Sequence, residues 1–163
     1  MKIVCTEKYF TILFVCILFF VEGCLGDKSS QNGSPTFPPQ NKTINWYTSL
    51  EDARKKSVTS KKLLMIYFFT TWSDWAKKMD KETYSYYKVV EMSGNFICVR
   101  IDLDKNPELE KTYNITGNPT VVFEDPFNGK KVYKIEGIRD RHEMTDEMKK
   151  MLSYKVEGGG RNE

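Results

Sequence analysis

The sequence is poor in cysteine and histidine and carries little net charge. Its 163 residues include four cysteines and one histidine, and the formal net charge is +3 at pH 7. A charge this small gives no reason to expect a nucleic-acid partner, and the mixture of acidic and basic residues is typical of a solvated surface. What is there, 40% hydrophobic and 29% charged residues, is the composition of one globular domain.

The cysteines also exclude a fold stabilised by disulfides. Cys5, Cys16 and Cys24 lie near the N-terminus, which leaves only Cys98 for the part expected to fold. With one cysteine the domain can form no internal disulfide, so its stability must come from a hydrophobic core. Cys98 lies inside a predicted central strand, where a cysteine is typically buried and inert. The alternative is that it acts as a lone redox thiol.

Residues 1–26 have the pattern of a signal peptide. Lys2 and Lys8 precede an apolar run over 10–21, and small residues follow it up to Gly26. The run is shorter than the about 20 apolar residues that span a bilayer. We therefore expect export to the periplasm or the cell exterior, with an uncleaved N-terminal membrane anchor as the alternative.

The segment Val21-Glu22-Gly23-Cys24 resembles a bacterial lipobox, in which the final cysteine is lipidated and becomes the N-terminus. Glu22 departs from that pattern, because a small or apolar residue is usual there. If Cys24 is lipidated, its acyl chains hold the protein at a membrane surface. If cleavage instead occurs near Gly26, Cys24 is discarded, and both outcomes stay open.

Composition divides the rest of the chain into three parts. Residues 27–43 are rich in Ser, Asn, Gln, Gly and Pro, as flexible linkers are. A folded domain is expected over 44–153, and residues 154–163 are expected to form a loose tail.

Within the domain, the hydrophobic pattern predicts strands that alternate with helices. The continuous apolar run over 63–69 is typical of a strand buried on both faces. Expected helices cover residues 50–57, 74–83, 85–92, 107–113 and 141–152, and expected strands cover 44–47, 63–69, 96–103, 120–124 and 130–136. Asn106 is expected to cap the helix that begins at Pro107. This order predicts an α/β fold, with a central mixed β-sheet flanked by helices on both faces.

Two segments carry a resemblance to a known family. Trp72-Ser73-Asp74-Trp75-Ala76-Lys77 follows the strand over 63–69 and opens a helix, and Gly117-Asn118-Pro119-Thr120 leads into a later strand. In this order and spacing they resemble the thioredoxin-like superfamily. The chain is most similar to exported thioredoxin-like domains such as the C-terminal domain of thiol–disulfide interchange proteins. The resemblance covers about residues 46–152 and implies a thioredoxin-like fold in which Pro119 is cis.

The resemblance also implies a loss of chemistry. Family members carry Trp-Cys-x-x-Cys-Lys, in which a helix N-terminus stabilises the first thiolate and the second cysteine resolves the mixed disulfide. Ser73-Asp74-Trp75-Ala76 replaces those residues, and Tyr67 stands where the family often has a buried acid. Ser73 is expected to cap the helix rather than act as a nucleophile, because nothing indicates that His142 approaches it. Ser73 and Ala76 are thus degenerate positions of a domain expected to be redox-inactive.

A binding surface can survive this loss. Family members use the backbone beside the cis-proline to hold an extended peptide by strand-like hydrogen bonds. Trp72 and Trp75 flank the corresponding place and could anchor a partner, although both could instead pack against the fold. The predicted peptide-binding residues are Trp72, Ser73, Trp75, Asn118, Pro119 and Thr120.

The leading hypothesis is an exported, redox-inactive protein that binds a protein or extended peptide, or serves as an assembly module, in the cell envelope. No cofactor and no metal ion are expected, since Asp102 and Asp104 have no clustered partners. The alternative is a thiol–disulfide oxidoreductase or isomerase-like factor that works through a single cysteine, either Cys98 or an unacylated Cys24. A third possibility is a purely structural component of an envelope assembly.

Overall fold

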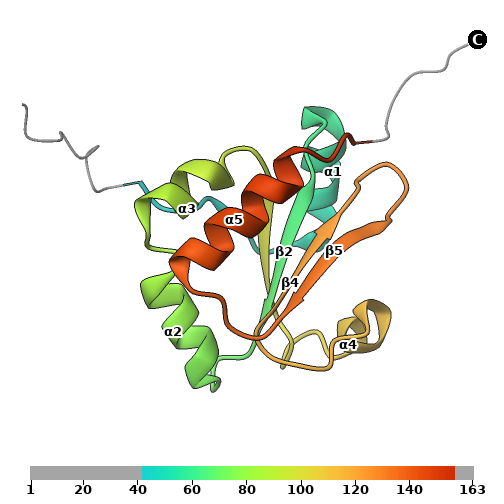
Figure 1. The fold of residues 1–163 in the computed structure, drawn as a ribbon. Helices are drawn as coiled ribbons and strands as arrows, with labels where there is room; N and C mark the ends of the chain where they lie inside the picture. Colours follow the sequence, from blue (N-terminus) through green and yellow to red (C-terminus); the bar gives the residue numbers. More distant parts are fainter. Residues whose placement is uncertain (1–41, 157–163) are drawn as a thin grey trace, which may run out of the picture. The chain divides into compact units, whose positions relative to one another are not determined.

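The computed structural model describes residues 42–156, in which a five-stranded sheet has the order β1-β3-β2-β4-β5 (Figure 1). The strands are β1 (Trp46–Tyr47), β2 (Leu64–Phe69), β3 (Ile97–Asp102), β4 (Thr120–Glu124) and β5 (Lys131–Glu136). β3 runs parallel to both β1 and β2, whereas β4 is antiparallel to β2 and β5 is antiparallel to β4. The sheet is therefore mixed, as predicted.

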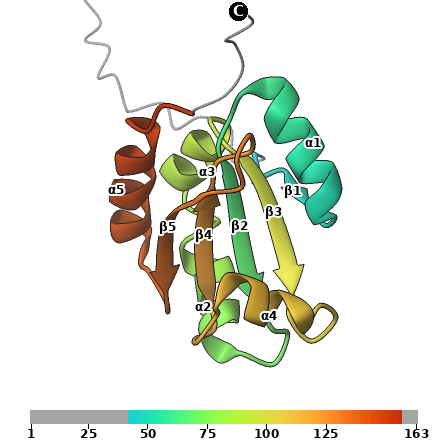
Figure 2. The same cartoon turned by 90° about the vertical axis from the view of Figure 1, so that its right-hand side faces the viewer.

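Helices cover both faces of this sheet. They are α1 (Leu50–Ser60), α2 (Asp74–Glu82), α3 (Tyr87–Ser93), α4 (Glu108–Tyr113) and α5 (Arg141–Leu152). Figure 2 shows α1 and α5 on opposite sides of the strands. One core cluster includes side chains of α1 and α4, and the other includes side chains of α2, α3 and α5. The α/β class with helices on both faces is confirmed.

Strand β2 joins the two clusters. Ile66 and Phe68 belong to the cluster beneath α1 and α4, and Met65 and Tyr67 belong to the one beneath α2, α3 and α5. These four side chains have no exposed surface. Burial of one large apolar side chain contributes about 1.5–3 kcal/mol. Burial on both faces explains why the apolar run of this strand is unbroken.

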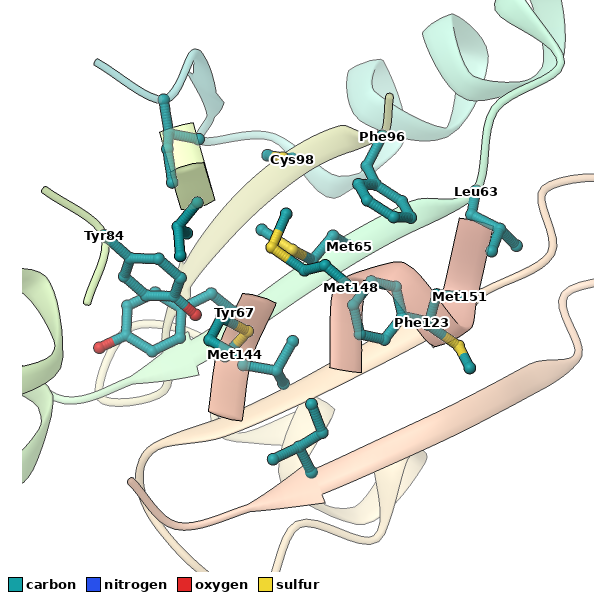
Figure 3. Close-up of a cluster of buried hydrophobic side chains, with 14 of the residues drawn as sticks. Leu63, Met65, Tyr67, Tyr84, Phe96, Cys98, Phe123, Met144, Met148 and Met151 are labelled. Atoms are coloured by element: carbon teal, nitrogen blue, oxygen red, sulfur yellow. The ribbon is translucent and has the colours of Figure 1, made fainter. Parts of the chain in front are cut away.

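The cluster beneath α5 is rich in sulfur (Figure 3). Its buried methionines are Met65 from β2, Met79 from α2, and Met144, Met148 and Met151 from α5. They share the cluster with Cys98, Phe96 and Phe123. Methionine fills irregular gaps well because its side chain is flexible and polarizable. Cys98 is a free thiol and forms no disulfide in the described part of the chain.

Several helix ends differ from the prediction by one to three residues, and those of α1 and α4 have a visible structural reason. Helix α1 continues about one turn further, to Ser60, because Lys61 adopts a left-handed φ of 53° and its N–H binds carbonyls of the last turn. Asn106 does not cap α4: no side-chain cap bond forms at the start of this helix, and the Asn106 side-chain amide donates to the Asp102 carbonyl at 2.9 Å. That helix begins at Glu108 instead.

The chain ends are described only in part. The signal-peptide pattern over 1–26 and nearly all of the linker over 27–43 lie outside the described residues. The tail expected from residue 154 begins inside them, and there Tyr154 and Val156 pack against the core. Within the described part of the chain, no helix is long and apolar enough to cross a membrane.

Candidate functional site

Ser73 and Ala76, where the resemblance places thiols, lie at the start of α2. Ser73 caps the helix, and its Oγ accepts a hydrogen bond from the Ala76 backbone N–H at 3.3 Å. Such a cap is typically worth about 1 kcal/mol. Both residues are enclosed, with exposed fractions of 5% and 2%. The start of α2 therefore has a neutral cap and no nucleophilic sulfur.

Trp72 and Trp75 stand on either side of Ser73 and reach the surface. They are 69% and 59% exposed, so they do not pack into the fold. The indole Nε1 of Trp72 donates to Asp104 Oδ1 at 3.3 Å. The Lys78 ammonium lies 6.0 Å from the ring centroid of Trp75. Exposed aromatic side chains are typical anchors of a protein interface.

The loop before β4 lies against this helix start. The Asn118–Pro119 peptide bond is cis, as the resemblance implies. The side-chain amide of Asn118 donates to Thr70 Oγ1, and the Thr70 carbonyl accepts the Ser73 N–H at 3.3 Å. On the other side, the Pro119 carbonyl accepts the Gly137 N–H at 2.8 Å. The cis-proline loop therefore connects the start of α2 to the segment that leads into α5.

Asn118 carries polar groups that the described chain leaves unused. Among residues 42–156, neither its backbone N–H nor its C=O forms a hydrogen bond, and its side-chain Oδ1 has no donor. Buried or half-buried backbone groups are normally paired. An extended peptide can complete such a pair by strand-like hydrogen bonding.

Other predicted binding residues are enclosed by the fold. Thr120 is fully buried, its Oγ1 donates to the Gly117 carbonyl at 2.6 Å, and its strand is paired on both sides. Its side chain is therefore out of reach of a peptide. Ser73 and Pro119 are also buried. They therefore support the surface around Trp72 and Trp75 from beneath and do not themselves contact solvent there.

Tyr67 puts a neutral group beneath the helix start, where the family often has an acid. It is fully buried, and its hydroxyl donates to the Ala76 carbonyl at 3.3 Å. Burial raises the pKa of the Tyr67 phenol well above its usual range. Nearby, Arg100 pairs with Asp80 at 3.0 Å and lies 4.5 Å from the ring centroid of Phe69. Tyr67 therefore cannot serve as a proton acceptor near neutral pH.

Cys98 lies far along the sheet from the start of α2. It pairs in register with Met65, near the end of β2 that is remote from Ser73. It is 3% exposed, and its thiol donates to the Ser93 carbonyl at 3.6 Å. Burial raises the pKa of the Cys98 thiol to about 12, so the nucleophilic thiolate is scarce near neutral pH. The other candidate thiol, Cys24, lies outside the described residues.

The remaining candidate groups form no reactive cluster. His142 lies in the first turn of α5, and its ring centroid is 5.8 Å from that of Tyr86. Asp102 pairs with Lys105 at 3.6 Å, and Asp104 accepts the indole bond described above. In the part of the chain that the structure describes, no three His, Cys, Asp or Glu side chains are grouped as metal ligands would be.

A groove of about 670 Å³ lies between α2 and the start of α5. Its lining includes Trp75, Lys78, Lys81, Ile138, Arg141 and His142. Figure 1 shows α5 beginning beside α2. No pattern in the sequence predicted this groove, because its walls come from two distant segments whose charges are typical of an ordinary solvated surface. Trp75 belongs both to the groove and to the helix start.

Comparison of the sequence with models of known protein families identifies the family of this chain. The model of the thioredoxin-like domain matches residues 50–152. The chain belongs to the thioredoxin-like domain family. The matched range contains every element from α1 to α5, so the start of α2 and the cis-proline loop are both parts of the thioredoxin-like domain.

Similar proteins include one named for disulfide interchange and one thioredoxin. The chain is 24% identical over 99 residues to the thiol:disulfide interchange protein DsbD of Campylobacter jejuni (strain RM1221), an alignment that covers 58% of this chain and 17% of that protein. It is 29% identical over 91 residues to Thioredoxin-1 of Drosophila melanogaster, with 56% of this chain and 80% of that protein covered. This thioredoxin-like chain thus spans a small part of the length of DsbD.

Solved structures share the fold. A thioredoxin from Thermus thermophilus has a TM-score of 0.62 at 23% identity, covering 68% of this chain and 88% of that one. The DsbH oxidoreductase has a TM-score of 0.61 at 23% identity, covering 76% of this chain and 94% of that one. A likeness at this level of identity establishes the thioredoxin-like fold, whereas the activity depends on the residues of the site.

Proposed function

We propose that this thioredoxin-like protein binds an extended segment of another protein and exchanges no disulfides with it. One observation carries the proposal: the backbone N–H and C=O of Asn118, which have no hydrogen-bond partner among residues 42–156, lie in a loop that contacts the segment leading into α2, with its exposed tryptophans and no thiol. Main-chain bonds to Asn118 would supply affinity with little regard to sequence. Trp72 and Trp75 would anchor apolar side chains.

The chemistry of the helix start supports a binding role. Disulfide exchange needs an attacking thiolate and a thiol that resolves the mixed disulfide. Ser73 and Ala76 supply neither atom, and the Ser73 hydroxyl is engaged in the helix cap. The burial and raised pKa of Cys98 argue against a single-cysteine enzyme that uses this residue.

The proposal includes a place of action in the cell envelope. Residues 1–26 have the signal-peptide pattern, and Cys24 is its candidate lipidation site. Fractionation of cells that express the full chain tests this part. If Cys24 is lipidated, Cys24→Ala should move the protein from the membrane fraction to the soluble fraction. A purely structural role would instead appear as stable co-purification with a large envelope complex.

Peptide binding can be measured with a defined probe. Reduced and carboxamidomethylated insulin B chain is unfolded and has no free thiol, so it can bind only non-covalently. We expect calorimetric titration to give saturable binding that Trp75→Ala weakens at least about tenfold, as loss of an aromatic anchor does. Tyr87→Ala is the matched control, because Tyr87 is 44% exposed but belongs to α3 and does not line the groove.

The contribution of the main chain needs a separate probe. A peptide of the same sequence with alternate backbone nitrogens methylated cannot pair with both groups of Asn118, so it should bind more weakly than its parent. Equal binding of the two peptides would show that strand-like pairing is absent. Wild-type affinity in Trp75→Ala would place the binding surface elsewhere.

A further inference from the structure

The groove beside Trp75 is continuous with the cis-proline loop. Gly137 donates its N–H to the Pro119 carbonyl at 2.8 Å, and the next residue, Ile138, already lines the groove. A peptide that pairs with Asn118 and extends past Trp75 therefore enters the groove.

Both walls of the groove are held in place. Thr83, just past the end of α2, donates its hydroxyl to the Arg139 carbonyl at 2.7 Å. At the start of α5, Asp140 accepts the backbone N–H groups of His142 and Glu143, and the Glu143 carboxylate accepts the Asp140 N–H at 2.9 Å. Because these bonds form without a ligand, the groove is preformed, which lowers the ordering cost of binding.

Four basic side chains line the groove without a carboxylate partner. They are Lys78, Lys81, Arg139 and Arg141. Among the described residues, none of the four forms an ion pair. Of the lining acids, Asp140 and Glu143 are engaged by backbone N–H groups, and Glu82 has no such bond. Arg139 likewise donates to the backbone carbonyls of Glu136 and Ile138. The charged side chains that remain available to a ligand are therefore Lys78, Lys81, Arg141 and Glu82, which are mostly cationic.

We propose that this groove selects acidic segments: the peptide held at Asn118 continues past Trp75 and places its Asp or Glu side chains beside the four cations. The inference rests on the proposed peptide-binding function and names the chemistry of the partner. Ile138 and Trp75 add apolar surface, so the groove fits acidic residues interspersed with apolar ones. Charges in a solvated groove act on selectivity and association rate, and salt screens them.

Three synthetic peptides of equal length test the proposal on the full chain. All share one apolar half, and the other half contains a run of Glu, Gln or Lys. At low ionic strength the Glu peptide should bind roughly fivefold more tightly than the Gln peptide, as a few exposed ion pairs allow. The Lys peptide should bind more weakly than either, and high salt should reduce the differences. Isothermal titration calorimetry measures all three affinities.

Substitutions in the groove sharpen the test. Lys78→Gln/Arg141→Gln should bring the affinity for the Glu peptide closer to that for the Gln peptide, because two of the four cations are removed. The affinity for the Gln peptide should not change. Glu82→Gln should raise the affinity for the Glu peptide, because it removes a like charge from the lining. The matched control is Lys77→Gln, which lies on α2 outside the groove, where Lys77 pairs with Asp74 at 3.2 Å. It should change neither affinity.

The outcomes separate this inference from the function on which it rests. If the three peptides bind equally and Trp75→Ala weakens them all, peptide binding stands and acidic selection is overturned. If Glu is preferred but the groove variants behave like Lys77→Gln, the groove does not carry the preference and the proposal fails. If none of the peptides binds, both the proposed function and the acidic preference are wrong.

Discussion

The start of α2 and the start of β3 differ: the first has a site suited to a reactive thiol but no thiol, and the second has a thiol in a site that keeps it unreactive. At the start of α2, the surface is open around two tryptophans and the helix N-terminus could stabilise an anion, yet Ser73 and Ala76 carry no sulfur. In β3, Cys98 has the sulfur but is 3% exposed, and burial raises its pKa to about 12. The reactive environment and the reactive atom thus occupy different regions of one domain.

The comparison shows that a cysteine count says little about redox function. A thiol becomes a nucleophile only where it is accessible and its thiolate is stabilised. In this chain the start of α2 has no cysteine pair, yet Ser73 caps the helix and the cis-proline loop is present.

Restoring both thiols is expected to have the largest effect. Ser73→Cys/Ala76→Cys should reduce insulin with dithiothreitol at least about tenfold faster than the wild type, because the start of α2 favours a thiolate. The turbidity of precipitating insulin B chain measures the rate. Ser73→Cys alone is the matched control and should stop at a mixed disulfide that Ala76 cannot resolve. Wild-type turnover above the dithiothreitol background would contradict redox inactivity.

The second largest effect is expected in the rate at which a thiol in each region reacts with a labelling reagent. In the native full chain, labelling of Cys98 by iodoacetamide should be at least about a hundredfold slower than in denaturant, because a buried thiol reacts only after local opening. Peptide mass spectrometry reads this site apart from the other cysteines. In Ser73→Cys/Ala76→Cys, the thiol at position 73 should label faster than Cys98, because the N-terminus of α2 stabilises its thiolate whereas burial raises the pKa of Cys98. Rapid native labelling of Cys98 would revive the single-cysteine enzyme.

The raised pKa of Cys98 should also appear in the pH dependence of stability. The folded thiol keeps its proton up to a pH of about 12, whereas in the unfolded chain it loses the proton from about pH 9. The free energy of unfolding should therefore fall as the pH rises through this window. Urea unfolding of wild type and Cys98→Ala measures the difference, and the variant should lose less stability. If the free energy of unfolding falls equally with pH in the wild type and in Cys98→Ala, Cys98 does not contribute to alkaline unfolding.

The smallest expected effect concerns the cap that replaced the nucleophile. Ser73→Ala should lower the free energy of unfolding by about 1 kcal/mol, because the Ala76 N–H loses its acceptor. Peptide affinity should stay unchanged, since the Ser73 side chain is enclosed. Thr71→Ala, at an exposed neighbour, is the control for urea unfolding. A loss of affinity equal to that of Trp75→Ala would show that Ser73 contacts the peptide directly.

Much of the fold could be predicted from local patterns. The apolar run over 63–69 marked β2, and the helix expected over 141–152 is α5. These features depend on neighbours in the sequence. Asn106 does not cap α4, and its side-chain amide donates to the Asp102 carbonyl instead. The sequence pattern that predicts helix starts does not predict this contact.

The candidate site was predictable only where family positions determine it. Trp72 and Trp75 could be located but not judged exposed or packed, because that depends on what the rest of the chain covers. The side chain of Thr120 is buried, and its strand β4 lies between β2 and β5. The groove joins α2 to the segment before α5, and only tertiary packing brings Lys78 and Arg141 to one lining.

The sulfur-rich core has a consequence for how the protein ages. Five of its seven methionines lie in the cluster beneath α5, where folding shields them from oxidants. When the chain opens, a single oxygen atom added to a thioether makes that side chain polar and chiral. A methionine sulfoxide at Met65 or Met148 fits poorly in a space that excludes water, so an oxidised chain should refold poorly. Outside a reducing compartment, each unfolding event therefore exposes these methionines to oxidation, and refolding does not reverse that oxidation.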